Sequence, residues 1–147
     1  MRKLILILFI GAIVYQWSEG NGAFSGLSSH EFQVDSSNTN ALESAYQNRL
    51  SDVQVSGEGV VIKLLRDDNK GSRHQKIIVR LPSGQTVLIA HNIDLAPRIN
   101  SLSTGDNLQF KGEYEWNNKG GVVHWTHHDP NGKHVGGWLK HKGVSYE

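Results

Sequence analysis

The sequence predicts a small, mostly β domain with little helix, folded as a closed five-stranded barrel. Two observations carry this prediction. Short segments rich in β-branched residues recur between polar turns after residue 52. One of these segments, residues 107–116, alternates apolar and polar side chains almost perfectly. The chain has 147 residues and no internal repeat, so it has room for one domain of this kind.

The composition excludes several classes of function. Lysine and arginine total 15 against 14 for aspartate and glutamate, so the formal net charge is +1 and the chain lacks the strong positive field of a dedicated nucleic-acid-binding protein. Cysteine is absent, which excludes disulfides, thiolate metal sites, a thiol nucleophile and a cysteine-linked lipid anchor. The chain has no Gly-x-Ser-x-Gly motif, and its sequence does not indicate enzymatic activity.

The N-terminus is predicted to be a targeting segment. Residues 1–3 give it a positive start, and residues 4–15 form an uninterrupted apolar run. A run of this length fits the core of a secretory signal peptide and is shorter than the roughly 20 residues of a usual membrane span. Residues 1–17 are therefore a signal peptide, or an inner-membrane anchor with Tyr15 and Trp17 at the interface if they are retained. We expect an extracytoplasmic protein, periplasmic in a bacterium.

The next segments lead into the folded domain. Residues 18–38 are rich in serine, glycine and asparagine, which predicts a flexible connector. Residues 39–147 are predicted to form the domain itself. It opens with a short amphipathic helix that runs to Leu50, with Asn38 or Thr39 as its cap.

Three strands are predicted after the helix. The first, residues 53–65, carries glycines in its middle and is expected to bend at a bulge. The second and third, residues 74–81 and 86–91, are joined by a tight turn that contains a proline and a glycine. They are expected to form a hairpin.

Two further strands complete the predicted barrel. A connector, irregular or with one to two helical turns, leads to the strand at residues 107–116, and a turn then leads to residues 122–128. Three strands, a connector and two strands, with glycines bending the first strand, is the order of the OB-fold. This five-stranded Greek-key barrel binds oligonucleotides and oligosaccharides in many proteins. Residues 53–128 resemble it.

The C-terminal part of the chain resembles a known family more closely. Its pattern runs from residues 112–116, through the segment His-Trp-Thr-His-His-Asp-Pro at residues 124–130, to Gly-Trp-Leu at residues 137–139. This pattern is similar to that of a bacterial family of small exported proteins, catalogued as domain of unknown function 3465. The resemblance covers residues 40–147 and implies an exported single-domain protein. It implies no particular activity.

Histidines are concentrated near the C-terminus. Five of the eight fall within residues 124–141, where they are interleaved with tryptophan and glycine. Imidazole is the commonest metal ligand, and its unperturbed pKa lies near neutrality. The cluster is therefore interpreted in three ways: as a ligand-binding surface, as a metal site, or as a polar and aromatic wall of the barrel whose ring nitrogens are all hydrogen-bonded.

The function predicted first is an exported binding module. Indole and phenol rings stack on bases or sugar rings, and lysines meet phosphates or sulfates. The expected ligand is an oligonucleotide, an oligosaccharide or another anionic, ring-containing molecule, with single-stranded nucleic acid or a polysaccharide as the partner. The predicted ligand-binding residues are Tyr114, Trp116, His124, Trp125, His127, Trp138, Lys111 and Lys140.

The alternative is a histidine-ligated metalloprotein, either a zinc or copper carrier or a zinc-dependent hydrolase. If residues 129–133 form a turn, His128 faces His134 with the two Cβ atoms about 5 Å apart, which is within reach of one ion. A tetrahedral zinc site needs a further ligand. The predicted metal ligands are His128, His134, Asp129 and His124. The glutamates of the fourth strand are expected to be ordinary solvated side chains.

Overall fold

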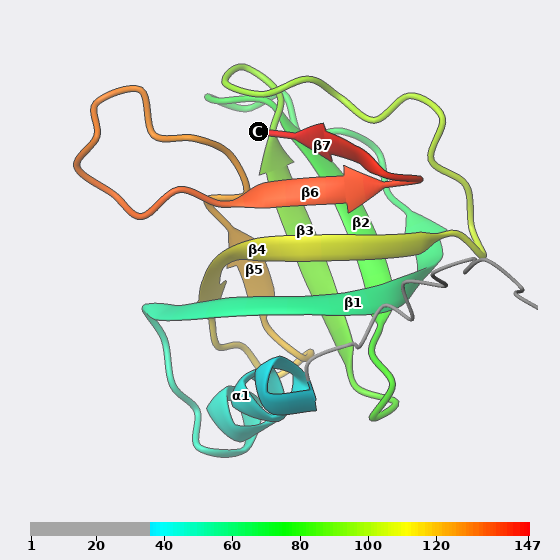
Figure 1. Cartoon of the computed structure of the whole chain (residues 1–147), viewed down its shortest axis with the longest axis vertical. Coiled ribbons are helices and arrows are strands. Elements are labelled where there is room, and N and C mark those ends of the chain that lie inside the picture. Colours follow the sequence, from blue (N-terminus) through cyan, green and yellow to red (C-terminus); the bar gives the residue numbers. More distant parts are fainter. Residues whose placement is uncertain (1–35) are drawn as a thin grey trace, which may run out of the picture. The chain divides into compact units, whose positions relative to one another are not determined.

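The computed structural model describes residues 36–147, where one helix precedes seven strands (Figure 1). In chain order the elements are α1 (Ser36–Gln47), β1 (Val53–Leu64), β2 (His74–Arg80), β3 (Thr86–Asn92), β4 (Asn107–Glu115), β5 (Val122–His124), β6 (Trp138–His141) and β7 (Val144–Tyr146). The predicted leader, residues 1–17, lies outside the described residues, as does most of the predicted connector. Within residues 36–147, no helix has the length and apolar character needed to cross a bilayer.

Five of the strands close into a barrel. Antiparallel pairs join β1 to β2, β2 to β3, β5 to β4 and β4 to β1, while β3 and β5 pair in parallel. The ring β1-β2-β3-β5-β4 therefore returns to its first strand. This arrangement confirms the predicted fold class, a mostly β domain built on a closed five-stranded barrel.

β1 closes the ring because it has a different partner along each half. Residues 53–60 pair with β4, and residues 60–64 pair with β2. A bulge between Val61 and Lys63 interrupts the second pairing. Bulges bend and twist a strand, which lets one strand serve both sides of a barrel. The sequence predicts the bulge at the glycines of this strand, and the structure places it just beyond them.

Side chains alternate between the core and the outer face, as a pleated strand requires. On β4, Leu108, Phe110 and Tyr114 are fully buried. The alternation predicted for this strand is confirmed. Its partly exposed outer side chains are Gln109, Lys111, Glu113 and Glu115.

α1 contributes Leu42 and Ala45 to the core and packs against β1 (Figure 1). The helix begins two residues before the predicted Asn38 and ends at Gln47, before the predicted residue 50. Its end has a local cause: Arg49 adopts a φ of 55°, and the Leu50 amide donates to the Ala45 carbonyl. A residue in the left-handed region with such a bond is a common helix terminator.

The connector between β3 and β4 forms turns and contains no helix. It still packs against the barrel, because Ile99 and Leu102 are buried. The buried Gln75 side chain holds this segment in place: its amide nitrogen donates to the Ile99 carbonyl, and its oxygen accepts from the Ile99 amide, at 3.0 and 2.9 Å. Both polar atoms of Gln75 are thereby satisfied inside the protein.

β5 is shorter than the sequence predicts. The predicted strand covers residues 122–128, but the strand ends at His124. The next residue, Trp125, adopts a φ of 54°, which lies in the left-handed region and cannot continue a strand. The prediction was therefore wrong for residues 125–128.

Residues 125–137, here called the 125–137 loop, leave the barrel and return to it (orange in Figure 1). Glu113 of β4 pairs with His124 of β5, and two residues away Lys111 pairs with Trp138 of β6. β6 therefore resumes the pairing with β4 that β5 begins. β5 and β6 therefore pair with successive parts of the same side of β4, and the loop separates them.

Two glycines let the backbone pass closely where the loop starts and ends. A Cβ atom on Gly137 would clash with the carbonyl oxygens of both Lys111 and Trp125, and one on Gly112 would clash with the His124 carbonyl. The Gly137 amide also donates to the His127 carbonyl at 2.9 Å. The two ends of the loop are thus held side by side against β4.

β6 and β7 form a C-terminal hairpin that the sequence did not predict. Lys142 and Gly143 make its turn with φ values of 50° and 78°, the two positive angles of a type I′ turn. The buried ring of His141 fastens β6 to the barrel, because its Nε2 lies 2.8 Å from Oδ2 of Asp106. His141 is therefore a structural residue here.

The close approach at Gly137 leads to a stability prediction. Gly137→Ala should lower the free energy of unfolding by more than about 2 kcal/mol, because the new methyl group meets two backbone carbonyls that cannot move independently. Gly136→Ala is the matched control. A Cβ there would make only ordinary contacts, 3.6 Å from the His127 carbonyl oxygen. Urea denaturation of both variants measures the difference, and equal stabilities would contradict the role given to Gly137.

Candidate functional site

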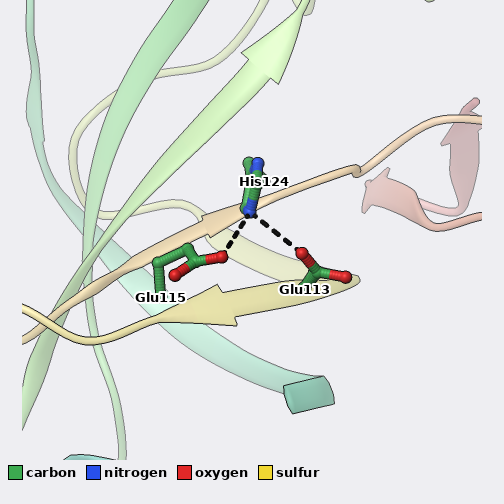
Figure 2. A group of neighbouring side chains, drawn as sticks. All are labelled: Glu113, Glu115 and His124. Atoms are coloured by element: carbon green, nitrogen blue, oxygen red, sulfur yellow. Dashed lines mark ion pairs between the residues drawn. The ribbon is translucent and has the colours of Figure 1, made fainter. Parts of the chain in front are cut away.

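The outer face of β4 meets β5 at a group of acidic and imidazole side chains. His124 is the cross-strand partner of Glu113, and Glu115 lies one outward-facing position along the same strand. Figure 2 shows the His124 ring directed between the two carboxylates. Its Nε2 lies 3.5 Å from Oε1 of Glu113 and 3.5 Å from Oε1 of Glu115. All three ligand-type atoms lie within 4.8 Å of one another.

The 125–137 loop brings a second histidine to the same carboxylate. His134 Nε2 lies 2.6 Å from Oε2 of Glu113, and its Nδ1 lies 2.8 Å from the Val135 carbonyl oxygen. A carboxylate and a carbonyl only accept hydrogen bonds, so this geometry favours the doubly protonated ring, in which both nitrogens donate. Burial acts to lower the pKa of His134, but the bonds to Val135 and Glu113 outweigh it and the pKa is raised.

Trp125 supports His134 from one side. The two rings are stacked, with centroids 3.9 Å apart and an interplanar angle of 11°. The His127 ring is tilted by 34° relative to the same indole, and the two ring centroids lie 5.3 Å apart. The left-handed backbone conformation of Trp125 therefore does more than end β5, because it places the indole where His134 can rest on it.

Other histidines are buried and serve the structure. His127 is 3% exposed, and its Nδ1 lies 2.7 Å from the His128 carbonyl oxygen. His91 is fully buried: its Nε2 donates to the Pro97 carbonyl, and its Nδ1 accepts from the Thr126 hydroxyl at 2.8 Å. That second bond ties the start of the 125–137 loop to β3. Burial lowers the pKa of His91 to about 4, so the ring is neutral at ordinary pH.

A groove lies beside the group, over the outer faces of β2, β3 and β5. One part, of about 220 Å³, is lined by His74, Ala90, Asn92, Leu95, His124, Trp125 and His127. A second part, of about 380 Å³, is lined by Asp68, His74, Lys76, Ala90, Glu115, Val122 and His124. The two parts share His74, Ala90 and His124, so they adjoin one another, and together they are called the groove here.

The predicted ligand-binding residues are divided by the structure. His124, Trp125 and His127 line the groove. Tyr114 is fully buried, with its hydroxyl bonded to the Gly120 carbonyl. The others lie elsewhere: Trp116 donates to Tyr46 of α1, Lys140 lies over the Trp138 ring at 4.5 Å, and Lys111 pairs with Trp138 on the outer face of β4.

The predicted metal ligands are also divided. His124 and His134 both meet Glu113. Asp129 instead organises the loop, because its carboxylate accepts hydrogen bonds from the amides of Asn131, Lys133 and His134. These bonds, with that of Asn131 the largest influence, hold the pKa of the Asp129 carboxyl below its usual range.

The predicted pairing of His128 with His134 across a hairpin is wrong. The turn at residue 129 does form, with the Gly132 amide donating to the Asp129 carbonyl. The residues on either side of that turn belong to no strand, however, and His128 is exposed. The two rings are therefore not placed by a ladder of backbone hydrogen bonds.

Sequence reasoning missed Glu113 and Glu115, which it took for solvated carboxylates. The predicted turn at residues 117–121 is centred on Lys119, so counting outward from it pairs Glu113 with Trp125 and misses His124 by one residue. In the structure, Glu113 pairs with His124. The approach of His134 depends on the path of the loop, which the sequence pattern does not indicate.

The chain matches a known protein family. Residues 25–147 match a family described as "Protein of unknown function (DUF3465)". No curated protein matches the chain. The family match agrees with the resemblance seen in the C-terminal motif.

The lowered pKa of His91 predicts a pH-dependent stability. Its folded pKa of about 4 lies below the unfolded value of 6.5. As pH falls below about 6.5 the unfolded chain therefore binds a proton that the folded chain does not, and stability is lost until about pH 4, by about 3 kcal/mol in all. Urea denaturation from pH 4 to 8 measures the loss. His91→Gln should flatten this part of the profile and the exposed control His128→Gln should not, and equal profiles for wild type and His91→Gln would refute the assignment.

Proposed function

Because this chain belongs to the DUF3465 family, whose function is unknown, we propose a function from its own residues: it is an exported binding module that takes an oligosaccharide in the groove over β2, β3 and β5. The single observation that carries the proposal is the depression at Ala90. There the short side chain leaves a hollow between longer side chains of β2 and β5. Export is supported by the positive and apolar start of residues 1–15.

The depression follows from strand pairing. Ala90 of β3 lies directly opposite Lys76 of β2, and Asn92 lies opposite His74. His124 stands on the other side, on β5. A methyl group flanked by lysine and histidine side chains leaves room for a ligand between them. These residues lie on paired strands, so little ordering of this part of the groove is needed when a ligand binds.

The lining favours a hydroxyl-rich ligand over a nucleic acid. The imidazoles of His74 and His124 and the amide of Asn92 offer hydrogen-bond donors, while Asp68 and Glu115 offer acceptors at the other end. Sugar hydroxyls use both kinds of group. A phosphodiester chain carries a negative charge at every repeat, so some of its charges would face Asp68 and Glu115, and a net charge of +1 gives it no compensating field. An oligosaccharide can carry a single acidic group and present only hydroxyls to these carboxylates.

Lys76 and the histidines also suit a sugar that carries an acidic group. His74 and His124 line both parts of the groove, while Lys76 lines the part that also holds Asp68 and Glu115. In the part nearest Trp125, none of the lining residues that the structure describes is a carboxylate. Leu95 and the edge of Trp125 give apolar contact there, although one face of the indole is covered by His134. The proposed ligand is therefore an acidic oligosaccharide.

Filling the groove at Ala90 tests the location. Ala90→Ile should weaken binding to an acidic oligosaccharide by at least about tenfold, because the larger side chain occupies the floor of the groove. Thr86→Ile, at another outward-facing position of β3 that does not line the groove, is the matched control. A panel of acidic and neutral oligosaccharides and an oligothymidylate, titrated against tryptophan fluorescence, provides the measurement. Binding that survives Ala90→Ile, or binding to the oligothymidylate alone, would reject the proposal.

Removing one charge tests the acidic substituent. Lys76→Gln should lower the affinity for the acidic oligosaccharide by about tenfold and reduce the salt dependence of that affinity. Affinity for a neutral oligosaccharide should change little. Lys63→Gln removes an exposed lysine of β1 outside the groove and serves as the control. Equal effects of the two substitutions would show that the charge acts from a distance and not within the groove.

A further inference from the structure

The side chains of Glu113, Glu115 and His124 are spaced as the ligands of one metal ion, and we propose that they bind a divalent transition metal, with zinc preferred. The site differs from the ligand set that the sequence predicts. It uses one histidine of that set as a ligand and leaves out His128 and Asp129. The inference goes beyond the proposed function and does not rest on it.

The two distances from His124 match a metal centre better than a hydrogen bond, and the two carboxylate oxygens lie within 4.8 Å of each other. Zinc bonds of about 2.0–2.2 Å to nitrogen and oxygen place tetrahedral ligand atoms roughly 3.3–3.6 Å apart. His124 Nε2 lies 3.5 Å from one oxygen of Glu113 and 3.5 Å from one oxygen of Glu115. A charge-assisted N–H···O bond is usually about 2.7–2.9 Å long. The nitrogen is therefore equidistant from the two carboxylates and forms a hydrogen bond with neither.

The same nitrogen is buried and has no hydrogen-bond partner among the described residues. This is unusual for a polar atom, because a buried and unsatisfied nitrogen destabilises the fold. The side chain is 34% exposed, so Nε2 and not the whole side chain is enclosed. An ion held between the three side chains would satisfy it.

His134 acts as an outer partner of the site. It holds Oε2 of Glu113 at 2.6 Å, which leaves Oε1 of the same carboxylate directed at His124. The stack on Trp125 and the bond to the Val135 carbonyl fix the ring of His134 in turn. Outer-shell partners of this kind orient metal ligands and commonly change affinity by about 10–100-fold when removed.

The donor set selects the class of ion. One imidazole nitrogen and two carboxylate oxygens suit zinc and its first-row neighbours, whereas magnesium prefers oxygen and water alone. Three protein ligands leave a fourth position free. His124 and Glu115 both line the groove, so that position is reached from it.

Zinc titration of the purified full chain, stripped with a chelator and free of saccharide, tests the site. Calorimetry at neutral pH should show one saturable site of micromolar affinity or better. Glu115→Gln and His124→Gln should each lower the affinity for zinc by more than about 100-fold, and His134→Gln should lower it by about tenfold. Glu58→Gln, a carboxylate on the outer face of neighbouring β1, should change it less than about twofold. Magnesium should not compete.

Two further measurements keep the test decisive. Glu115 is 39% exposed, so its substitution tests the site even if His124→Gln does not fold. Cobalt in place of zinc should give the intense visible bands of a four-coordinate ion, and Glu115→Gln should abolish them. No saturable zinc binding, or binding unchanged in both variants, overturns the inference. Binding lost in His128→Ala but kept in Glu115→Gln would place the ion in the 125–137 loop and also overturns it.

The experiments can reject the zinc site and the saccharide groove independently of each other. Lys76→Gln removes no proposed metal ligand and should leave zinc affinity unchanged while it weakens the acidic oligosaccharide. Loss of zinc binding in Lys76→Gln would show that the ion depends on Lys76, which contradicts the ligand set Glu113, Glu115 and His124. Saccharide binding without zinc binding rejects this inference alone.

Discussion

The pairing of β1 with both β2 and β4 is the constraint on which the rest of the structure depends. It turns an open sheet into a ring without free inner edges, so each strand has one row of side chains inside and one outside. The inner row of β4 is buried, so its outer row lies on the outside of the barrel, where the side chains are partly exposed. Glu113 and Glu115 are neighbours on that outer row because they are two residues apart on a strand whose facing is fixed by closure.

Hydrogen bonds and a ring stack hold the 125–137 loop against the barrel. The Thr126 hydroxyl on His91, the Asp129 carboxylate on three loop amides and the stack of His134 on Trp125 each hold part of the 125–137 loop. None of these contacts is apolar packing in the core. The loop therefore owes its shape to hydrogen bonds and ring contacts, and His134 reaches Glu113 only while they persist.

The periodicity of the sequence was sufficient to predict the barrel, but it was not sufficient to predict the 125–137 loop. The alternation along β4, the hairpin of β2 and β3 and the helix before β1 are local patterns, and the structure contains all of them. The end of β5 depends on one non-glycine residue, Trp125, in a left-handed conformation that no pattern indicates. The contact between His134 and Glu113 joins residues 21 positions apart through an irregular path. Its geometry arises from tertiary structure, which propensity does not encode.

The glycines at the base of the loop have a consequence for how the protein can diversify. Gly112 and Gly137 keep the entry and exit of the chain adjacent, while β5 and β6 hold β4 on either side of the interruption. The entropy cost of closing a loop rises only with the logarithm of its length. The segment between residues 128 and 136 can therefore lengthen at little cost to the barrel, whereas a change at His134 would release the Glu113 carboxylate on the outer row of β4.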